Sequence, residues 1–211
     1  MTRLEPEVGI LALTFGLAVF SHCALAQTAA SSAITKTTTF TSPNGDFEFR
    51  YPSWMIDCRH DPKNQSCSSY MPVCSGLNDE AMICIAYPKD RIAAPKTFDG
   101  AAFMVALVKD AHDDKACSQI PDPPPPSFSH PHTEKINGVD FWVTHTASAA
   151  SSHGDDSFIY RTFQNHQCYE LDINISGVSP MVYDPPRPKY FNVEAVQKAL
   201  EQPLHSFKFT N

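Results

Sequence analysis

Hydrophobic and polar residues alternate in the stretch FEFRY (47–51), where aromatic side chains are separated by Glu48 and Arg50. This period of two predicts a β-strand with one buried and one solvated face. A second β-rich run, TKTTTF (35–40), comes before it, and Ser42-Pro43-Asn44-Gly45 separates the two. Turn residues between two such runs are typical of a hairpin. The sequence therefore predicts a strand pair at the start of the folded part.

The same alternation recurs over a longer stretch, SFIYRTFQNHQCYELDINIS (157–176). With Asn165-His166 as the turn, two residues face each other when their residue numbers add up to 331. Arg161 then lies opposite Glu170 on the polar face, a favourable cross-strand pair. The apolar face carries Phe158, Tyr160 and Thr162 opposite Ile173, Leu171 and Tyr169. Two independent patterns, apolar facing and charge pairing, thus predict one register.

A third hairpin is expected at 130–146, where HPHTEKINGVDFWVTH has an Asn137-Gly138 pair at its centre. Asn-Gly favours a two-residue type I′ turn, so facing positions sum to 275. His130 then opposes His145, and His132 opposes Val143. Pro131 indicates an edge strand at the open end of this hairpin.

The remaining pattern predicts two helices and two further strands. TFDGAAFMVALVKDAH (97–112) has a helical apolar stripe with Thr97 as N-cap, and NVEAVQKALEQP (192–203) has Asn192 as N-cap and Pro203 as its end. AMICIAYP (81–88) and LHSFKF (204–209) are expected as strands, and the proline runs at 120–131 and 184–188 as stiff connectors. We therefore expect an α+β fold, an antiparallel β-sheet with helices packed on it.

Several of these segments resemble the PsbP-like family, which includes the extrinsic photosystem II protein and many exported bacterial proteins and lipoproteins. The resemblance lies in FEFRYPSWM (47–55), INGVDFW (136–142), QCYELDINIS (167–176) and a terminal helix leading to HSFKF (205–209), and it covers about 37–209. It implies an α/β/α sandwich and a binding or assembly role, and it supplies no catalytic residues. The cysteine-rich stretch at 57–80 and the lack of a bipartite leader depart from the family pattern.

The first residues are typical of a secretory signal peptide. Arg3 precedes the apolar run VGILALTFGLAVF (8–20), and Ala24 and Ala26 occupy the two small positions of a cleavage site. We expect cleavage after Ala26, a flexible tail at 27–36 and a single globular domain at 37–211. Cys23 as a lipidated cysteine is the alternative, but a histidine precedes it where lipoprotein signals have a small residue.

Charge and length narrow the choice of partners. Removing Arg3, Glu5 and Glu7 with the leader leaves 185 residues with 15 basic and 21 acidic side chains, a net charge of −6. An acidic chain without a basic run is not expected to bind nucleic acid or anionic membranes. No apolar run after the leader is long enough for a membrane span.

Six cysteines remain after the leader is removed: Cys58, Cys67, Cys74, Cys84, Cys117 and Cys168. An even number in an exported chain predicts disulfides, and no C-x-x-C spacing supports a zinc ribbon or a redox motif. Fifteen pairings are possible. We favour two local bonds among the first four cysteines and one long-range bond from Cys117 to Cys168, over the rival hypothesis of one free nucleophilic cysteine.

Three function hypotheses remain, for a secreted or periplasmic protein. The first is a non-catalytic binding or assembly module with an unknown envelope protein as partner and no cofactor. The second is a zinc or copper site formed by His130, His132 and His145 at the open end of the hairpin. The third is an unrecognised hydrolase, although no G-x-S-x-G, P-loop or G-x-G-x-x-G motif occurs. Asp113-Asp114 and Asp155-Asp156 fit no calcium loop and are expected to be solvated.

Overall fold

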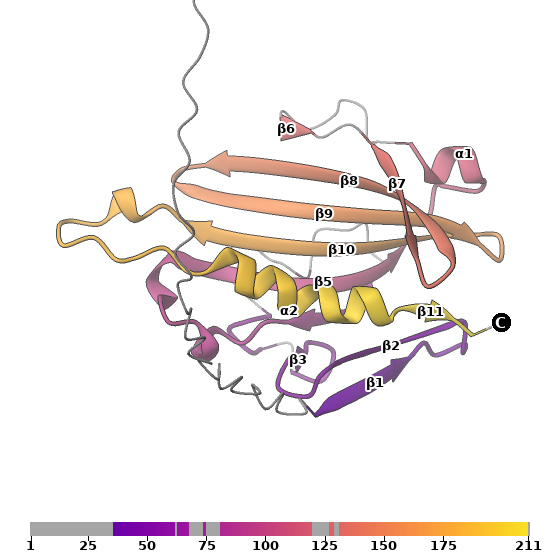
Figure 1. Ribbon diagram of the computed structural model, residues 1–211, viewed down its shortest axis with the longest axis horizontal. Coiled ribbons are helices and arrows are strands. Elements are labelled where there is room, and N and C mark those ends of the chain that lie inside the picture. Colours follow the sequence, from indigo (N-terminus) through magenta and orange to yellow (C-terminus); the bar gives the residue numbers. More distant parts are fainter. Residues whose placement is uncertain are drawn as a thin grey trace, which may run out of the picture. The chain divides into compact units, whose positions relative to one another are not determined.

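Two antiparallel sheets and one long helix organise the chain (Figure 1). The computed structural model describes residues 36–61, 63–67, 74, 81–119, 127–128 and 131–210. The large sheet has the order β3 (Ile56–Asp57), β4 (Ala81–Ala86), β5 (Phe98–Leu107), β10 (Gln167–Val178), β9 (His153–Gln164), β8 (Val139–Ala150), β6 (Ser127–Phe128), and β7 (His132–Ile136) also pairs with β8. The small sheet has the order β1 (Thr37–Thr41), β2 (Phe47–Pro52), β11 (Lys208–Phe209).

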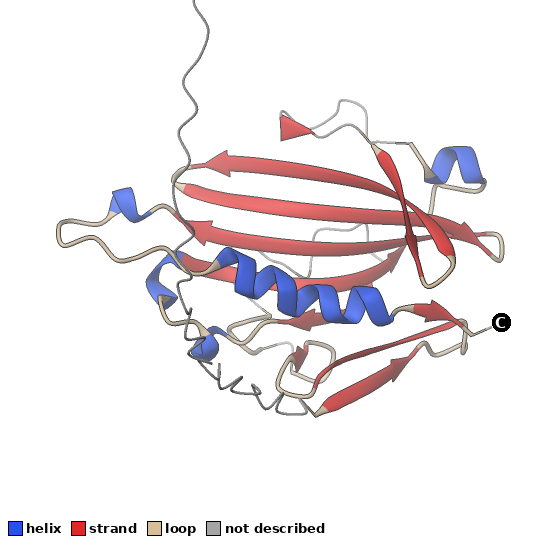
Figure 2. Cartoon of the chain, in the orientation of Figure 1, coloured by secondary structure: helices blue, strands red, loops and turns tan. Residues whose placement is uncertain are grey.

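Helical segments are short except for one. The α-helices are α1 (Asp114–Cys117) and α2 (Val193–Ser206), and the 3₁₀ turns are η1 (Lys89–Arg91), η2 (Pro95–Thr97) and η3 (Pro180–Val182). Figure 2 shows α2 lying along the large sheet. The predicted α+β class with an antiparallel sheet is therefore confirmed. No helix of the described residues is both long and apolar enough to cross a bilayer.

Both predicted registers are confirmed. In the β9–β10 pair, Gln164 faces Gln167 and Arg161 faces Glu170, as the sum of 331 requires. In the β7–β8 pair, Ile136 faces Val139 and His132 faces Val143, as the sum of 275 requires. These pairings follow from local information, because turn chemistry and side-chain alternation fix the register of a hairpin.

The prediction of a helix at 97–112 is wrong, because residues 98–107 form the central strand β5. β5 lies between β4 and β10, and both of its faces are covered. Phe103 and Val105 point into the main core, whereas Ala102 and Met104 pack under the disulfides on the opposite face. A strand buried on both faces is apolar throughout and can imitate the apolar stripe of a helix.

The C-terminal helix α2 begins as predicted but ends later. The Asn192 side chain accepts a hydrogen bond from the Ala195 amide at 3.0 Å, as an N-cap does. Pro203 does not end the helix, which continues to Ser206. Proline at this position removes a single amide donor, and its buried ring packs with the core face of the helix.

The main core lies between the large sheet, α2 and the small sheet. Phe47 and Phe49 of β2 contact Tyr169 and Phe103 of the large sheet at ring-centroid distances of 5.9 and 5.2 Å. Leu200 of α2 is fully buried in the same cluster. The small sheet and α2 therefore cover one face of the large sheet together.

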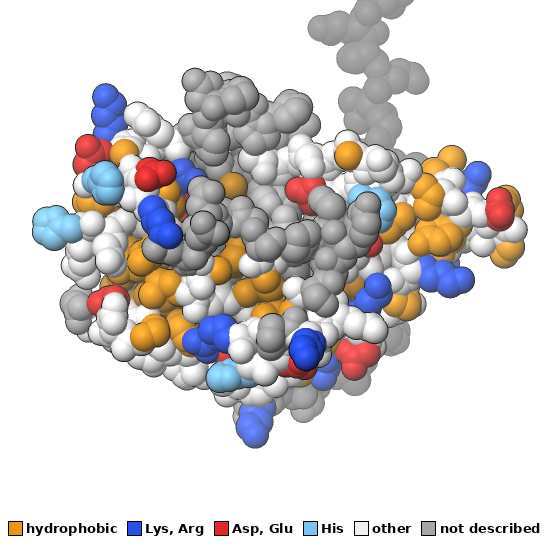
Figure 3. All heavy atoms as spheres, turned by 180° about the vertical axis from the view of Figure 1, so that it is seen from behind, with side chains coloured by type: hydrophobic (Ala, Val, Ile, Leu, Met, Phe, Trp, Pro, Cys, Tyr) orange, Lys and Arg blue, Asp and Glu red, His pale blue; other side chains and the backbone are white. Residues whose placement is uncertain are grey.

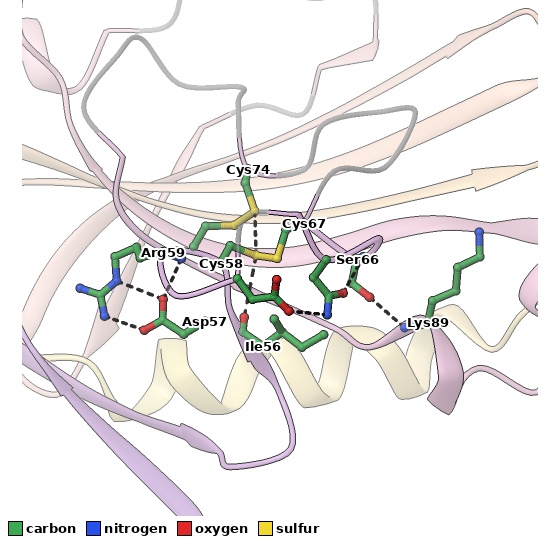
Figure 4. Close-up of a disulfide and its surroundings, with 11 residues drawn as sticks. Ile56, Asp57, Cys58, Arg59, Ser66, Cys67, Cys74 and Lys89 are labelled. Carbon is green, nitrogen blue, oxygen red and sulfur yellow. Dashed lines mark hydrogen bonds and ion pairs between the residues drawn. A yellow bond between two sulfur atoms is a disulfide. The ribbon is translucent and has the colours of Figure 1, made fainter.

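Disulfides hold a segment against the opposite face of the large sheet. The bonds are Cys58–Cys67, Cys74–Cys84 and Cys117–Cys168, separated by 9, 10 and 51 residues. Figure 4 shows the first of these beside Cys74. Cys58 and Cys67 are packed with Ala86, Ala102 and Met104. The expected disulfide stapling is confirmed, and the cysteine-rich segment has a small core of its own.

Candidate functional site

The predicted histidine site is only partly within the described residues, because His130 lies outside them. His132 is exposed on the edge strand β7. The His145 ring stacks on Phe158 with centroids 4.4 Å apart, and its Nε2 atom lies 3.1 Å from Asp156 Oδ1. In the described part of the chain, three or more metal-donor side chains come within 4.8 Å of one another only at Cys58, Cys74 and Cys84, which form disulfides. The three-histidine site therefore stays a prediction.

A second histidine–aspartate pair lies at the end of the large sheet. His153 Nδ1 is 2.6 Å from Asp99 Oδ2, and the two side chains are 25% and 12% exposed. His153 begins β9 and Asp99 belongs to β5, and β10 runs between these strands. The pair thus ties together three strands at the point where the sheet ends.

Gly177 of β10 makes room for the chain segment that leaves the sheet beside this pair. The register of β10 against β5 shifts between Ser176 and Gly177, which marks an irregularity of the β-bulge type. A Cβ atom on Gly177 would lie 2.6 Å from both Tyr190 OH and Phe191 Cε1, and 2.8 Å from the Thr97 carbonyl. Only glycine allows this close approach of Tyr190.

Tyr190 closes one side of a shallow cavity of about 340 Å³, which His153, Ser152 and Ser179 also line. Partial burial raises the pKa of the Tyr190 phenol, and the carboxylates of Asp156 and Asp99 raise it further. Both aspartates of the histidine–aspartate pairs therefore act electrostatically on the same phenol, which is 47% exposed.

A histidine oriented by an aspartate is the arrangement of a general base, which a hydrolase would require. A nucleophile must also lie within hydrogen-bond reach of that base. The Ser176 hydroxyl is fully buried and has no hydrogen-bond partner, and the Ser179 hydroxyl accepts from the Met181 amide. His153 thus has the arrangement of a general base, but the Ser176 hydroxyl makes no hydrogen bond with it.

Two buried carboxylates lie on β10, on the sheet face opposite the main core. Arg161 Nε donates to Glu170 Oε2 at 2.5 Å, but Glu170 Oε1 and Asp172 Oδ1 have no hydrogen-bond partner. Burial raises the pKa of Glu170 above its usual value, although the Arg161 guanidinium opposes this shift. Burial also raises the pKa of Asp172 well above its usual value, and the charges of Glu170 and Asp155 raise it further.

Sequence reasoning placed Glu170 and Asp172 on a polar face and did not single out Asp99 or Tyr190. The alternation that fixes the strand puts both acids opposite the core, where solvation is the ordinary outcome. Their burial depends on what covers that face, which the local pattern does not contain. Asp99 had no signal, because its partner His153 is 54 residues away.

Comparison with known proteins assigns no function. No family model matches the chain, and no curated protein matches it. The PsbP-like resemblance therefore stays a prediction.

Solved structures with partial similarity have low identity. A protein from Bacteroides thetaiotaomicron is 13% identical with a TM-score of 0.47 over 82% of this chain, which spans about half (48%) of that protein. The Saccharomyces cerevisiae Ran-binding protein Mog1p is 10% identical with a TM-score of 0.42, covering 84% of this chain and 97% of its own. LpqN of Mycobacterium tuberculosis, described as involved in cell envelope biogenesis, is 9% identical with a TM-score of 0.41, covering 83% and 91%.

Proposed function

We propose that this chain is an exported, non-catalytic binding module that docks a partner protein of the cell envelope. The docking surface is the loop Ser179–Asn192 between β10 and α2, called here the docking loop. Three disulfides support the exported location, because such bonds persist in oxidising compartments.

The observation that carries the proposal is the exposure of apolar side chains on this one loop. Met181, Val182 and Tyr190 are 68%, 50% and 47% exposed, and they are all of the exposed large hydrophobic residues in the described part of the chain. Figure 3 shows hydrophobic side chains gathered at the loop end of the molecule, on the right of that view. Exposed apolar residues that gather in one place are typical of protein–protein contact sites.

The docking loop is fastened to the sheet by hydrogen bonds at both ends and in its middle. The Ser179 amide donates to the Ser152 carbonyl at 2.9 Å, and the Phe191 amide donates to Thr97 Oγ1 at 3.1 Å. The Tyr183 hydroxyl donates to the Lys96 carbonyl at 2.6 Å. A loop held in this way loses little conformational entropy on binding, so its apolar contacts contribute more of their energy to affinity.

Charges around the docking loop indicate the chemistry of the partner. Arg187 and Lys189 are exposed on the loop, Lys96 is exposed next to it, and Asp184 is the one acidic residue of the loop. The loop itself has a net charge of +1, from Arg187 and Lys189 against Asp184, although the whole chain is acidic; the carboxylates of Asp99 and Asp156 act on Tyr190 at its end. The partner is therefore a protein with an apolar surface for Met181 and Val182 and with acidic side chains where it meets Arg187 and Lys189.

Photocrosslinking in the exporting cell tests the proposal. A photoreactive residue at Met181 or Tyr190 should give a discrete adduct with one protein, and the same residue at Lys208, on the small sheet, should not. The isolated partner should bind Met181→Ser/Val182→Ser at least tenfold more weakly than the native chain, whereas Lys198→Ser, on α2, should bind normally.

Two results would contradict the proposal. Folded protein that gives no adduct at either loop position would remove the docking loop as a contact site. An adduct between two copies of this chain would show that the loop mediates self-association instead of partner binding.

A further inference from the structure

A cavity lies beside η1, whose three residues form part of its lining. It has a volume of about 440 Å³, within the usual range for small-molecule sites. Three separate segments line it: the turn after β2, the disulfide-closed loop at 58–67, and η1. The lining side chains include Trp54, Gln65, Lys89, Asp90 and Arg91.

One wall of this cavity is held by the Cys58–Cys67 disulfide. The Ser66 hydroxyl inside that loop accepts a hydrogen bond from the Lys89 amide at 3.1 Å, which joins the loop to η1. Figure 4 shows Ser66 directed toward Lys89, next to the disulfide. The Ser66 amide in turn donates to Asn64 Oδ1 at 3.0 Å. The wall is therefore preformed, which is a second role for a disulfide that also packs on the sheet.

An aromatic ring and two cations lie along the cavity. Arg91 Cζ is 4.6 Å from the Trp54 ring centroid, a cation–π contact, and Tyr87 supports the indole from its edge at 5.3 Å. No ion pair joins Lys89 or Arg91 to a carboxylate of the described residues within 4.0 Å. Lys89 and Arg91 outnumber the single carboxylate of the lining, Asp90, and a net positive lining favours an anionic ligand.

The other lining groups favour a ligand that carries hydroxyl groups. Gln65 offers an amide that donates and accepts hydrogen bonds, and Asp90 offers a carboxylate that accepts them. The indole of Trp54 is partly exposed and provides an apolar surface between these polar groups. A pyranose ring has the matching properties, an apolar C–H face with hydroxyl groups at its edge.

We infer that this cavity binds an acidic saccharide, a sugar ring that bears a carboxylate or a phosphate. Arg91 and Lys89 bind the anionic group, Trp54 packs against the ring, and Gln65 and Asp90 bind the hydroxyl groups. This site is separate from the docking loop, so either can exist without the other.

NMR titration of the mature, oxidised protein tests the inference with four probes: glucuronate, glucose 6-phosphate, glucose and inorganic phosphate. The Trp54 indole N–H signal should shift on addition of at least one acidic sugar. Glucose and inorganic phosphate should each bind at least tenfold more weakly than that sugar, because each lacks half of the recognised chemistry. Comparison of the two acidic sugars shows whether the anionic group is a carboxylate or a phosphate.

Matched variants separate the site from general charge effects. Arg91→Gln should weaken binding of the acidic sugar at least tenfold, whereas Arg187→Gln, an exposed arginine of the docking loop, should leave it unchanged. An unperturbed spectrum elsewhere verifies that each variant is folded. Equal binding of glucose and glucuronate, equal binding of inorganic phosphate and glucose 6-phosphate, equal loss in both variants, or no binding of either acidic sugar would each overturn the inference.

Discussion

At the scale of single residues, Asp172 is an acidic group in unfavourable surroundings. Its carboxylate is buried, lies near Glu170 and has an oxygen without a hydrogen-bond partner. An ionised carboxylate in such surroundings destabilises the fold, because no protein group replaces the water that it has lost.

Replacing Asp172 by asparagine should therefore stabilise the protein at pH 7. We expect the free energy of unfolding to rise by about 1–3 kcal/mol, because the asparagine amide, unlike the carboxylate, carries no charge that must be desolvated or that Glu170 would repel. Urea unfolding of the two proteins measures it. Asp140→Asn, at an exposed aspartate paired with Lys135, is the control and should change stability by less than about 0.5 kcal/mol. A loss of stability in Asp172→Asn would show that the buried charge is compensated.

The raised pKa of Asp172 also predicts that its contribution to the stability of the fold decreases as the pH rises. The folded state holds a proton on this group at pH values where the unfolded chain has released it. Stability is therefore greatest below the unfolded pKa and decreases as the pH rises through the folded pKa. Urea unfolding from pH 4 upward should show this decrease in the native chain, and the contribution should be absent in Asp172→Asn.

Two glycines give a matched test of close packing. Gly177→Ala should destabilise the protein by about 1–3 kcal/mol, because the new methyl group would overlap Tyr190, Phe191 and the Thr97 carbonyl. Gly154→Ala should be nearly neutral, since its Cβ would meet only the Ser148 carbonyl at 3.5 Å. Thermal unfolding of both variants checks the difference. Equal effects would mean that the Tyr190 segment can move away at little cost.

At the scale of elements, the three disulfides differ in the length of chain that they close. The Cys117–Cys168 bond spans 51 residues and joins α1 to β10, whereas Cys58–Cys67 spans 9 residues. In the chain-entropy model, a longer closed loop restricts the unfolded state more.

Removing the long-range disulfide should therefore cost more stability than removing a local one. We expect Cys117→Ala/Cys168→Ala to lower the free energy of unfolding by about 4 kcal/mol, and Cys58→Ala/Cys67→Ala by about 3 kcal/mol. Urea unfolding without reductant measures both. If the local pair cost more, packing of its sulfurs on Ala102 and Met104 would outweigh loop closure.

At the scale of the whole molecule, the fold should not depend on a metal ion. Packing in the core and three disulfides supply its stability, so a chelator should leave the unfolding midpoint of the oxidised protein unchanged. His145→Ala should have only a small effect, through loss of its contacts with Phe158 and Asp156.

Elemental mass spectrometry of untagged protein checks this expectation. Less than one equivalent of zinc or copper agrees with it. A stoichiometric metal that disappears in His145→Ala would instead support the site predicted from His130, His132 and His145.

The strand registers and the cap of α2 could be determined from the sequence, because each depends on neighbouring residues. Asn137-Gly138 fixes one hairpin, the alternation around Asn165-His166 fixes another, and Asn192 caps a helix three residues before Ala195. Such signals do not depend on distant parts of the chain, since the hydrogen bonds of a turn or a cap are made within its own segment.

Only the tertiary structure decided which surfaces are covered. β5 is a strand because it pairs with β4 on one edge and with β10, which lies far from it in sequence, on the other, and Asp172 is buried although its strand pattern assigns it to a polar face. Trp54 and Arg91, which meet at the cavity, are 37 positions apart in the sequence. His153 and Asp99, which form a pair, are 54 positions apart. Burial and long-range contact depend on segments distant in sequence, and the local pattern of hydrophobic and polar residues carries no information about them.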